Sequence, residues 1–151
     1  MNLRVLPPTW GIAIVRVMAG IIITVAAFEK FFGGGFDGFT RLSAGLGLPL
    51  PAFWGVFIPL LELIGGALLL VGLGARWVAF LFIIEYFVTA FVLKVPRQPP
   101  FGGWDSMRID LMLWAAVIAV AACGAGAFAL ENVLLRRGGE ADQFAGRPVT
   151  G

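Results

Sequence analysis

The chain alternates long apolar runs with shorter segments that carry most of its glycine, proline and charge. A helix needs roughly 20 apolar residues to cross the hydrocarbon core of a bilayer. Four runs are long enough, at about residues 10–32, 53–71, 76–93 and 109–130. They lack the short alternating segments of a transmembrane β-barrel. The pattern therefore predicts an all-α integral membrane protein, with a four-helix bundle in residues 1–135 and a mobile polar tail at 136–151.

The connections between these runs differ in length. Residues 72–74, Gly-Leu-Gly, leave room only for a tight turn, so the second and third helices should be antiparallel neighbours. The loop at residues 94–107 holds three prolines and is expected to be irregular. The loop at residues 33–52 has apolar residues at near-helical spacing, which predicts a short helix at the membrane interface: Phe36, Phe39, Leu42 and Leu46.

Composition narrows the function classes. Of the 151 residues, 60% are hydrophobic and 13% are charged, whereas about a quarter of the residues in a soluble domain are charged. The formal net charge is +2 with no basic cluster, so no nucleic-acid surface is predicted. Histidine is absent and Cys123 is the only cysteine, which excludes histidine-ligated haem or zinc, an intramolecular disulfide and a cysteine-ligated cluster. No intrinsic cofactor and no metal site are expected, while a bound quinone or lipid remains compatible with the chain.

Charged residues inside the apolar runs are the candidate functional residues. Glu62 and Glu85 lie near the centres of the second and third runs, and Arg16 lies in the first. A charge at the bilayer centre costs about 2.5–3.5 kcal/mol on insertion scales, so we expect these charges to pair. The sequence predicts that Arg16 meets Glu62, with Glu85 as the competing acid. Lys30 and Asp110, at the loop-side ends of the first and fourth runs, are expected to form interfacial caps and pairs.

Three interpretations of these charges stay open. They can form a structural clasp that fixes the helix register, a binding site for a small polar or quinone-like molecule, or a path for protons or ions. No catalytic residue is assigned.

Small residues mark the expected packing faces, because they let membrane helices approach closely. Gly20 shares a stripe with Arg16, and Gly65 and Gly66 share a face with Glu62 and are expected to admit the first helix.

These residues resemble those of the DoxX-like proteins. Arg16, Gly20 and Lys30 match the family's first helix, and "ELIGGALLLVGLGAR", residues 62–76, is similar to its E-x-x-G-G-x-x-L-x-x-G signature. "GAGAFALE", residues 124–131, resembles the closing G-P-G-x-x-S-L-D, with alanine in place of the proline and glutamate in place of the aspartate. Asp110 falls where the family often has an acid at the start of its fourth helix.

The resemblance implies a four-helix bundle with both termini cytoplasmic, in the inner membrane of a bacterium. Lysine and arginine counts are equal on the two sides of the membrane and give no orientation by themselves.

Some members of this family are subunits of a thiosulfate:quinone oxidoreductase, and others associate with redox-defence proteins. We therefore expect an accessory or anchoring subunit of a membrane oxidoreductase or electron-transfer complex, whose partners are membrane lipids and other membrane subunits. The alternatives are an autonomous thiosulfate- or quinone-linked oxidoreductase and a small transporter, although four helices without a repeat suit alternating access poorly.

Overall fold

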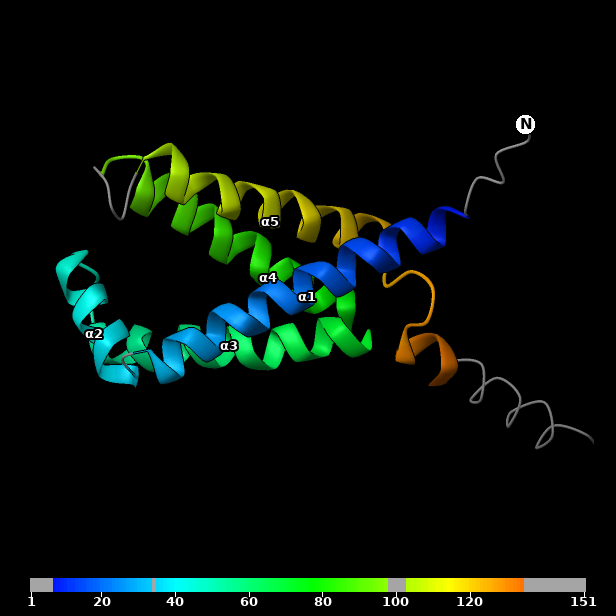
Figure 1. Cartoon of the computed structure of the whole chain (residues 1–151), viewed down its shortest axis with the longest axis horizontal. Coiled ribbons are helices and arrows are strands. Elements are labelled where there is room, and N and C mark those ends of the chain that lie inside the picture. Colours follow the sequence, from blue (N-terminus) through cyan, green and yellow to red (C-terminus); the bar gives the residue numbers. More distant parts are fainter. Residues whose placement is uncertain (1–6, 34, 98–102, 135–151) are drawn as a thin grey trace, which may run out of the picture.

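The computed structural model describes residues 7–33, 35–97 and 103–134, and this part of the chain is built from helices (Figure 1). Four helices are long and apolar enough to cross a membrane. The predicted four-helix membrane bundle is therefore confirmed. The elements are α1 (Pro8–Phe32), α2 (Gly35–Gly45), α3 (Pro51–Val71), α4 (Ala75–Phe87), which continues as the π-helix η1 (Val88–Lys94), and α5 (Trp104–Cys123).

The bundle consists of two closely packed helix pairs. Among the four long helices, the most extensive contacts are those of α1 with α3 and of α4 with α5, and α1 also touches α5 (Figure 1). Fully buried side chains from all four long helices form the core: Ile23, Leu69, Phe82, Val117 and Val120. The outer faces remain apolar, with Trp77 81% and Met112 74% exposed, as expected of surfaces that face lipid.

The short helix expected in the first long loop is present as α2. It packs on α1 and on the beginning of α3. The approach to α3 is close, because a Cβ atom on Gly55 would lie 2.9 Å from the Cα atom of Thr40. A side chain at position 55 would therefore push α2 away from α3.

The fourth long helix begins and ends earlier than predicted. We expected it at residues 109–130, but α5 spans Trp104–Cys123. Its limits are set by Gly103 (φ 85°) and Gly124 (φ 87°), because a side chain disfavours this backbone conformation. Residues 104–107, expected in an irregular loop, form the first turn of α5.

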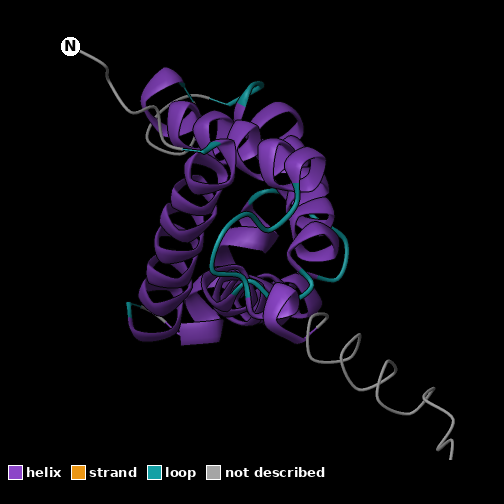
Figure 2. Cartoon of the chain, turned by 90° about the vertical axis from the view of Figure 1, so that its right-hand side faces the viewer, coloured by secondary structure: helices purple, strands orange, loops and turns teal. Residues whose placement is uncertain are grey.

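The chain after α5 folds back over one end of the bundle. Figure 2 looks onto the end at which α3 joins α4 and shows loop backbone lying across the helices there. The segment is held by hydrogen bonds from Ala127 N to Thr9 O (2.9 Å) and from Glu131 N to Gly72 O (3.2 Å). The predicted mobile tail at 136–151 lies outside the described residues.

Candidate functional site

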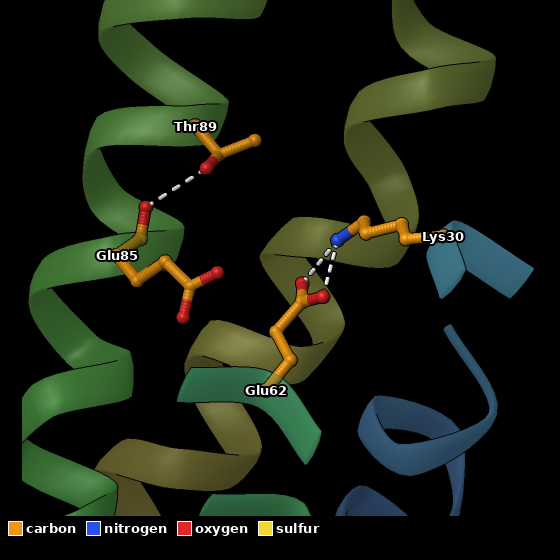
Figure 3. Close-up of polar contacts among 4 residues, drawn as sticks. All are labelled: Lys30, Glu62, Glu85 and Thr89. Atoms are coloured by element: carbon orange, nitrogen blue, oxygen red, sulfur yellow. Dashed lines mark hydrogen bonds and ion pairs between the residues drawn. The ribbon is translucent and has the colours of Figure 1, made fainter. Parts of the chain in front are cut away.

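An ion pair links α1 to α3 inside the bundle. The Lys30 ammonium group donates hydrogen bonds to both carboxylate oxygens of Glu62 (Figure 3). The Glu62 side chain is only 4% exposed, and the Lys30 side chain is 27% exposed. Lys30 lies in the last turn of α1, and its Nζ atom also lies 5.2 Å from the centre of the Phe39 ring of α2. The predicted pairing of Glu62 with Arg16 is therefore wrong, since Lys30 holds this carboxylate.

Arg16 is buried, with 1% of its surface exposed, but it bonds to backbone carbonyls. Its guanidinium group donates to Leu69 O, to Leu70 O at 3.0 Å and to Ala125 O at 2.7 Å. A longer contact of 3.5 Å reaches Ala127 O. The last carbonyls of a helix have no partner within the helix, so Arg16 satisfies the end of α3 and fastens the segment after α5 to it.

The antiparallel packing of α1 and α3 explains why Arg16 does not reach Glu62. Arg16 lies level with Leu69 and Leu70 near the end of α3. Seven residues of helix separate Glu62 from Leu69, which is about 10 Å along the axis. Lys30, near the other end of α1, extends its side chain back toward the middle of α3 instead.

Glu85 brings a second carboxylate from α4 toward this pair. In Figure 3 its carboxylate points to the side where Lys30 and Glu62 lie. Its Oε2 atom is buried and has no hydrogen-bond partner among the described residues. Thr89, one turn further along in η1, donates its hydroxyl to the backbone carbonyl of Glu85 at 3.0 Å and not to the carboxylate. The Glu85 and Glu62 carboxyl groups also lie within hydrogen-bonding reach of each other, so a proton bound at Glu85 can be shared with Glu62, and Oε2 remains able to accept a hydrogen bond from a ligand.

A second ion pair joins η1 to α5. Lys94 Nζ lies 2.7 Å from Asp110 Oδ2, and both side chains are largely buried. Lys94 also donates to the backbone carbonyl of Ser106 at 3.0 Å. Asp110 interacts electrostatically with both Glu62 and Glu85. We call the connected set the buried charge cluster: Lys30, Glu62, Glu85, Lys94 and Asp110.

The cluster contains most of the candidate residues and one that the sequence analysis missed. Lys30 pairs with Glu62, and Glu85 and Asp110 interact electrostatically with that carboxylate, whereas Arg16 lies apart. Lys94 was not proposed as a site residue. The sequence nevertheless indicated this pair, because Lys94 stands at the end of the third apolar run and Asp110 near the start of the fourth. Within the described residues, the cluster sets three carboxyl groups against two ammonium groups.

Glycines allow the helices that carry the cluster to pack closely. A Cβ atom on Gly20 would lie 3.1 Å from Gly66 O, and one on Gly66 would lie 3.0 Å from Thr24 N. This is the α1–α3 contact expected for Gly20 and Gly66. Gly65 faces α4 instead, since a Cβ atom there would lie 2.6 Å from the Phe82 ring. The expectation that Gly65 admits the first helix is therefore wrong.

A cavity of about 250 Å³ between α1 and α2 reaches the cluster. Lys30 lines it together with Glu29, Phe39 and the backbones of three glycines. A molecule that enters there can meet the Lys30 ammonium group directly. In the described residues no three histidine, cysteine, aspartate or glutamate side chains converge as metal ligands. The chemistry that the cluster offers is hydrogen bonding from Lys30 and the holding or transfer of a proton at Glu85.

Comparison with known proteins gives the family. The DoxX family pattern matches residues 11–95, a span that contains Arg16, Lys30, Glu62, Glu85 and Lys94. A Bacillus subtilis (strain 168) protein named "Putative oxidoreductase CatD" is 32% identical over 126 residues, which cover 83% of this chain and 88% of that protein. This chain belongs to the DoxX family. No solved structure matches it. The matched DoxX span ends before Asp110, so the family pattern covers the α1, α3 and α4–η1 parts of the cluster.

Proposed function

We propose that this DoxX protein is a membrane subunit of an oxidoreductase or electron-transfer assembly, and that its buried charge cluster holds the headgroup of a quinone-like molecule. The observation that carries the proposal is the buried Oε2 atom of Glu85, which accepts no hydrogen bond within the part of the chain that the structure describes and lies on the side of the Lys30–Glu62 pair. The printed name of the Bacillus subtilis relative supports the oxidoreductase class.

The unpartnered oxygen matters because a polar group in a membrane interior is costly. Ionisable residues at that depth are rare and mark substrate, ion or proton sites. A quinol hydroxyl can donate to the Glu85 carboxylate, and a quinone carbonyl can accept from the Lys30 ammonium group. The cavity beside Lys30 supplies an approach from the α1–α2 side of the bundle.

The residues of the chain determine which part of the quinone chemistry we assign to this protein and which to a partner subunit. Conversion of a quinone to a quinol takes up two electrons and two protons. The chain supplies no histidine and one cysteine, so the electrons would come from a redox centre in a partner subunit. Glu85 would exchange one of the two protons with the headgroup and water would exchange the other, while the Lys30–Glu62 pair would orient the headgroup. In this proposal the protein lies in a bacterial inner membrane.

The test is gentle detergent extraction of the tagged chain, followed by mass spectrometry of the proteins and quinones that copurify. We expect redox-protein partners and bound quinone with the wild-type chain. Glu85→Leu should lower bound quinone about tenfold, which corresponds to about 1.4 kcal/mol of lost interaction. Asp105→Asn is the matched control, because its side chain is 88% exposed and outside the cluster.

Other results would support a different function or contradict the proposed headgroup site. Quinone retained without any protein partner would favour an autonomous enzyme. Flux of a substrate through the purified protein in liposomes would favour a transporter. Equal quinone retention by wild type and Glu85→Leu would contradict a headgroup site at Glu85.

A further inference from the structure

A larger cavity lies at the opposite end of the bundle from Lys30. Its volume is about 520 Å³, within the range of about 300–1,000 Å³ typical of small-ligand sites. Four parts of the chain line it: the start of α1, the start of α4, the last residue of α5, and the segment that follows α5. Its chemistry comes from Arg76, Glu131 and Asn132, beside an apolar wall that includes Pro8 and Ile12.

The wall formed by the segment after α5 is fixed in place. Arg16 donates to Ala125 O from beneath, and Asn132 Nδ2 donates to Gly126 O at 2.8 Å. Gly126 has φ of 73°, and a Cβ atom on it would lie 2.8 Å from Thr9 O. The close approach of this segment to α1 therefore requires glycine. A preformed wall reduces the entropy that a ligand must lose on binding.

Two opposite charges line this cavity without neutralising each other. Arg76 is exposed, and within the described part of the chain its guanidinium group makes one hydrogen bond, a long one of 3.4 Å to Ala122 O. Glu131 accepts a hydrogen bond from Ala75 N at 3.3 Å through Oε2. The ion pairs of the described residues involve neither Arg76 nor Glu131. An arginine has five N–H donors and a carboxylate can accept several bonds, so both groups keep capacity for a ligand.

We propose that this cavity binds a zwitterionic ligand, whose anionic oxygens contact Arg76 and whose ammonium group contacts Glu131. The planar guanidinium group matches phosphate and carboxylate oxygens in a bidentate geometry. The position at the end of membrane-length helices suits the headgroup of phosphatidylethanolamine, with the glycerol region against Ile12. A soluble zwitterion such as glycerophosphoethanolamine has the same charged groups and is the other source of this chemistry.

Cys123 provides a direct measure of occupancy. It is the only cysteine of the chain, it is exposed, and it lines the same cavity. The experiment measures the rate of maleimide labelling of the full-length, delipidated protein in detergent. The probes are short-chain phosphatidylethanolamine, short-chain phosphatidylglycerol, which lacks the ammonium group, and glycerophosphoethanolamine. We expect phosphatidylethanolamine to slow labelling about tenfold more than phosphatidylglycerol, because the hydrogen bond between its ammonium group and the Glu131 carboxylate is charge-assisted and therefore strong.

Charge-removing variants test the two contacts separately. Glu131→Gln keeps an acceptor for Ala75 N but loses the negative charge, so protection by phosphatidylethanolamine should require about tenfold more lipid. Arg76→Gln should weaken protection by both lipids. Arg108→Gln is the control, because it removes an exposed arginine from the other end of α5. Protection is expressed for each variant as the ratio of its labelling rates without and with lipid, because the charge of Arg76 in the same cavity affects the reactivity of the Cys123 thiol itself.

The outcomes separate the source of the ligand from the validity of the site. Protection by phosphatidylethanolamine alone supports a lipid headgroup, and equal protection by glycerophosphoethanolamine supports a soluble zwitterion. Equal protection by phosphatidylglycerol and phosphatidylethanolamine, unchanged in Glu131→Gln, would overturn the zwitterion assignment. The absence of protection by all three probes would also overturn it.

Discussion

Arg16 and Lys30 are two basic residues of one helix with different partners, and the difference follows from their side chains. The guanidinium group of Arg16 is planar and rigid, and it spreads its donors over carbonyls of α3 and of the segment after α5. The Lys30 ammonium group is compact and flexible, and it joins both oxygens of one carboxylate. Arg16 therefore holds backbone segments together, while Lys30 neutralises Glu62.

The Lys30–Glu62 pair should appear as an energetic coupling. In a double-mutant cycle with Lys30→Met and Glu62→Gln, we expect the losses in unfolding free energy to be non-additive. Polar interactions between membrane helices average about 0.6 kcal/mol and reach about 1.7 kcal/mol, and an ion pair should lie near the upper value. The measurement is denaturant unfolding in mixed micelles. A cycle of Arg16→Met with Glu62→Gln is the control and should be additive within about 0.5 kcal/mol. Coupling in the control cycle alone would contradict the structure.

Arg16→Lys tests the fastening role of the guanidinium group. A single ammonium group cannot reach the carbonyls of Leu69 and Ala125 in the geometry of Arg16, so a buried acceptor should lose its partner. Each such acceptor costs about 1–3 kcal/mol of stability. Arg41→Lys, on an exposed residue of α2, should leave the unfolding free energy unchanged. If the two variants lost the same stability in micelles, the specific role of Arg16 would be wrong.

At the level of whole elements, close packing of α1 on α3 sets the position of the cluster. Gly20 and Gly66 bring the two backbones together, and this contact fixes how far the helices are shifted along each other. The same shift places Arg16 at the end of α3 and lets Lys30 reach Glu62. The π-helix η1 adds wider turns at the end of α4, which often mark functional positions.

Gly66→Ala should therefore weaken the α1–α3 contact. The added methyl group would lie 3.0 Å from the backbone nitrogen of Thr24, so α1 must move. We expect a loss of about 1–3 kcal/mol in unfolding free energy, the usual cost of overpacking. The matched control is Gly11→Ala in α1, where a methyl group would meet nothing within 4 Å. The control should be neutral or stabilising, and equal destabilisation of both variants would contradict the packing argument.

At the level of the whole molecule, four membrane-length helices place the two ends of the bundle on opposite sides of the membrane. The α3–α4 turn, the start of α1 and the segment after α5 share one end. The other end carries α2 and the start of α5. The two cavities lie at these different ends, so ligands of one would not compete for the other.

We predict that the end with the α3–α4 turn faces the cytoplasm. In a Cys123→Ser background, a membrane-impermeant maleimide added to intact cells should label Asp37→Cys and Asp105→Cys, which lie on the α2 end. Leu73→Cys, in the α3–α4 turn, should be labelled only after the membrane is opened. The basis is the DoxX resemblance, since the charge counts give no direction. The reverse labelling pattern would invert the assignment.

The sequence by itself determined the class of fold. In a bilayer every backbone group must be hydrogen-bonded within the protein, so a spanning segment is either an α-helix or a strand of a closed barrel. Four runs of about 20 apolar residues without the alternation of barrel strands are therefore helices. It also marked the buried charges, because an acid such as Glu62 or Glu85 stands out in an apolar run. The sequence also indicated the packing role of Gly20 and Gly66, because small residues mark close contacts between membrane helices.

Only the tertiary structure decided which charges meet. Charge complementarity alone allowed Arg16 to pair with Glu62 or Glu85, because both signs occur at similar depths in the sequence. The actual partners depend on the shift of α1 along α3 and on carbonyls that a distant segment brings to Arg16. The ends of α5 were likewise set by backbone conformations at Gly103 and Gly124, which the apolar pattern does not encode. Hydropathy records how much of a segment is apolar, whereas pairing depends on the relative placement of helices, which arises only when they pack.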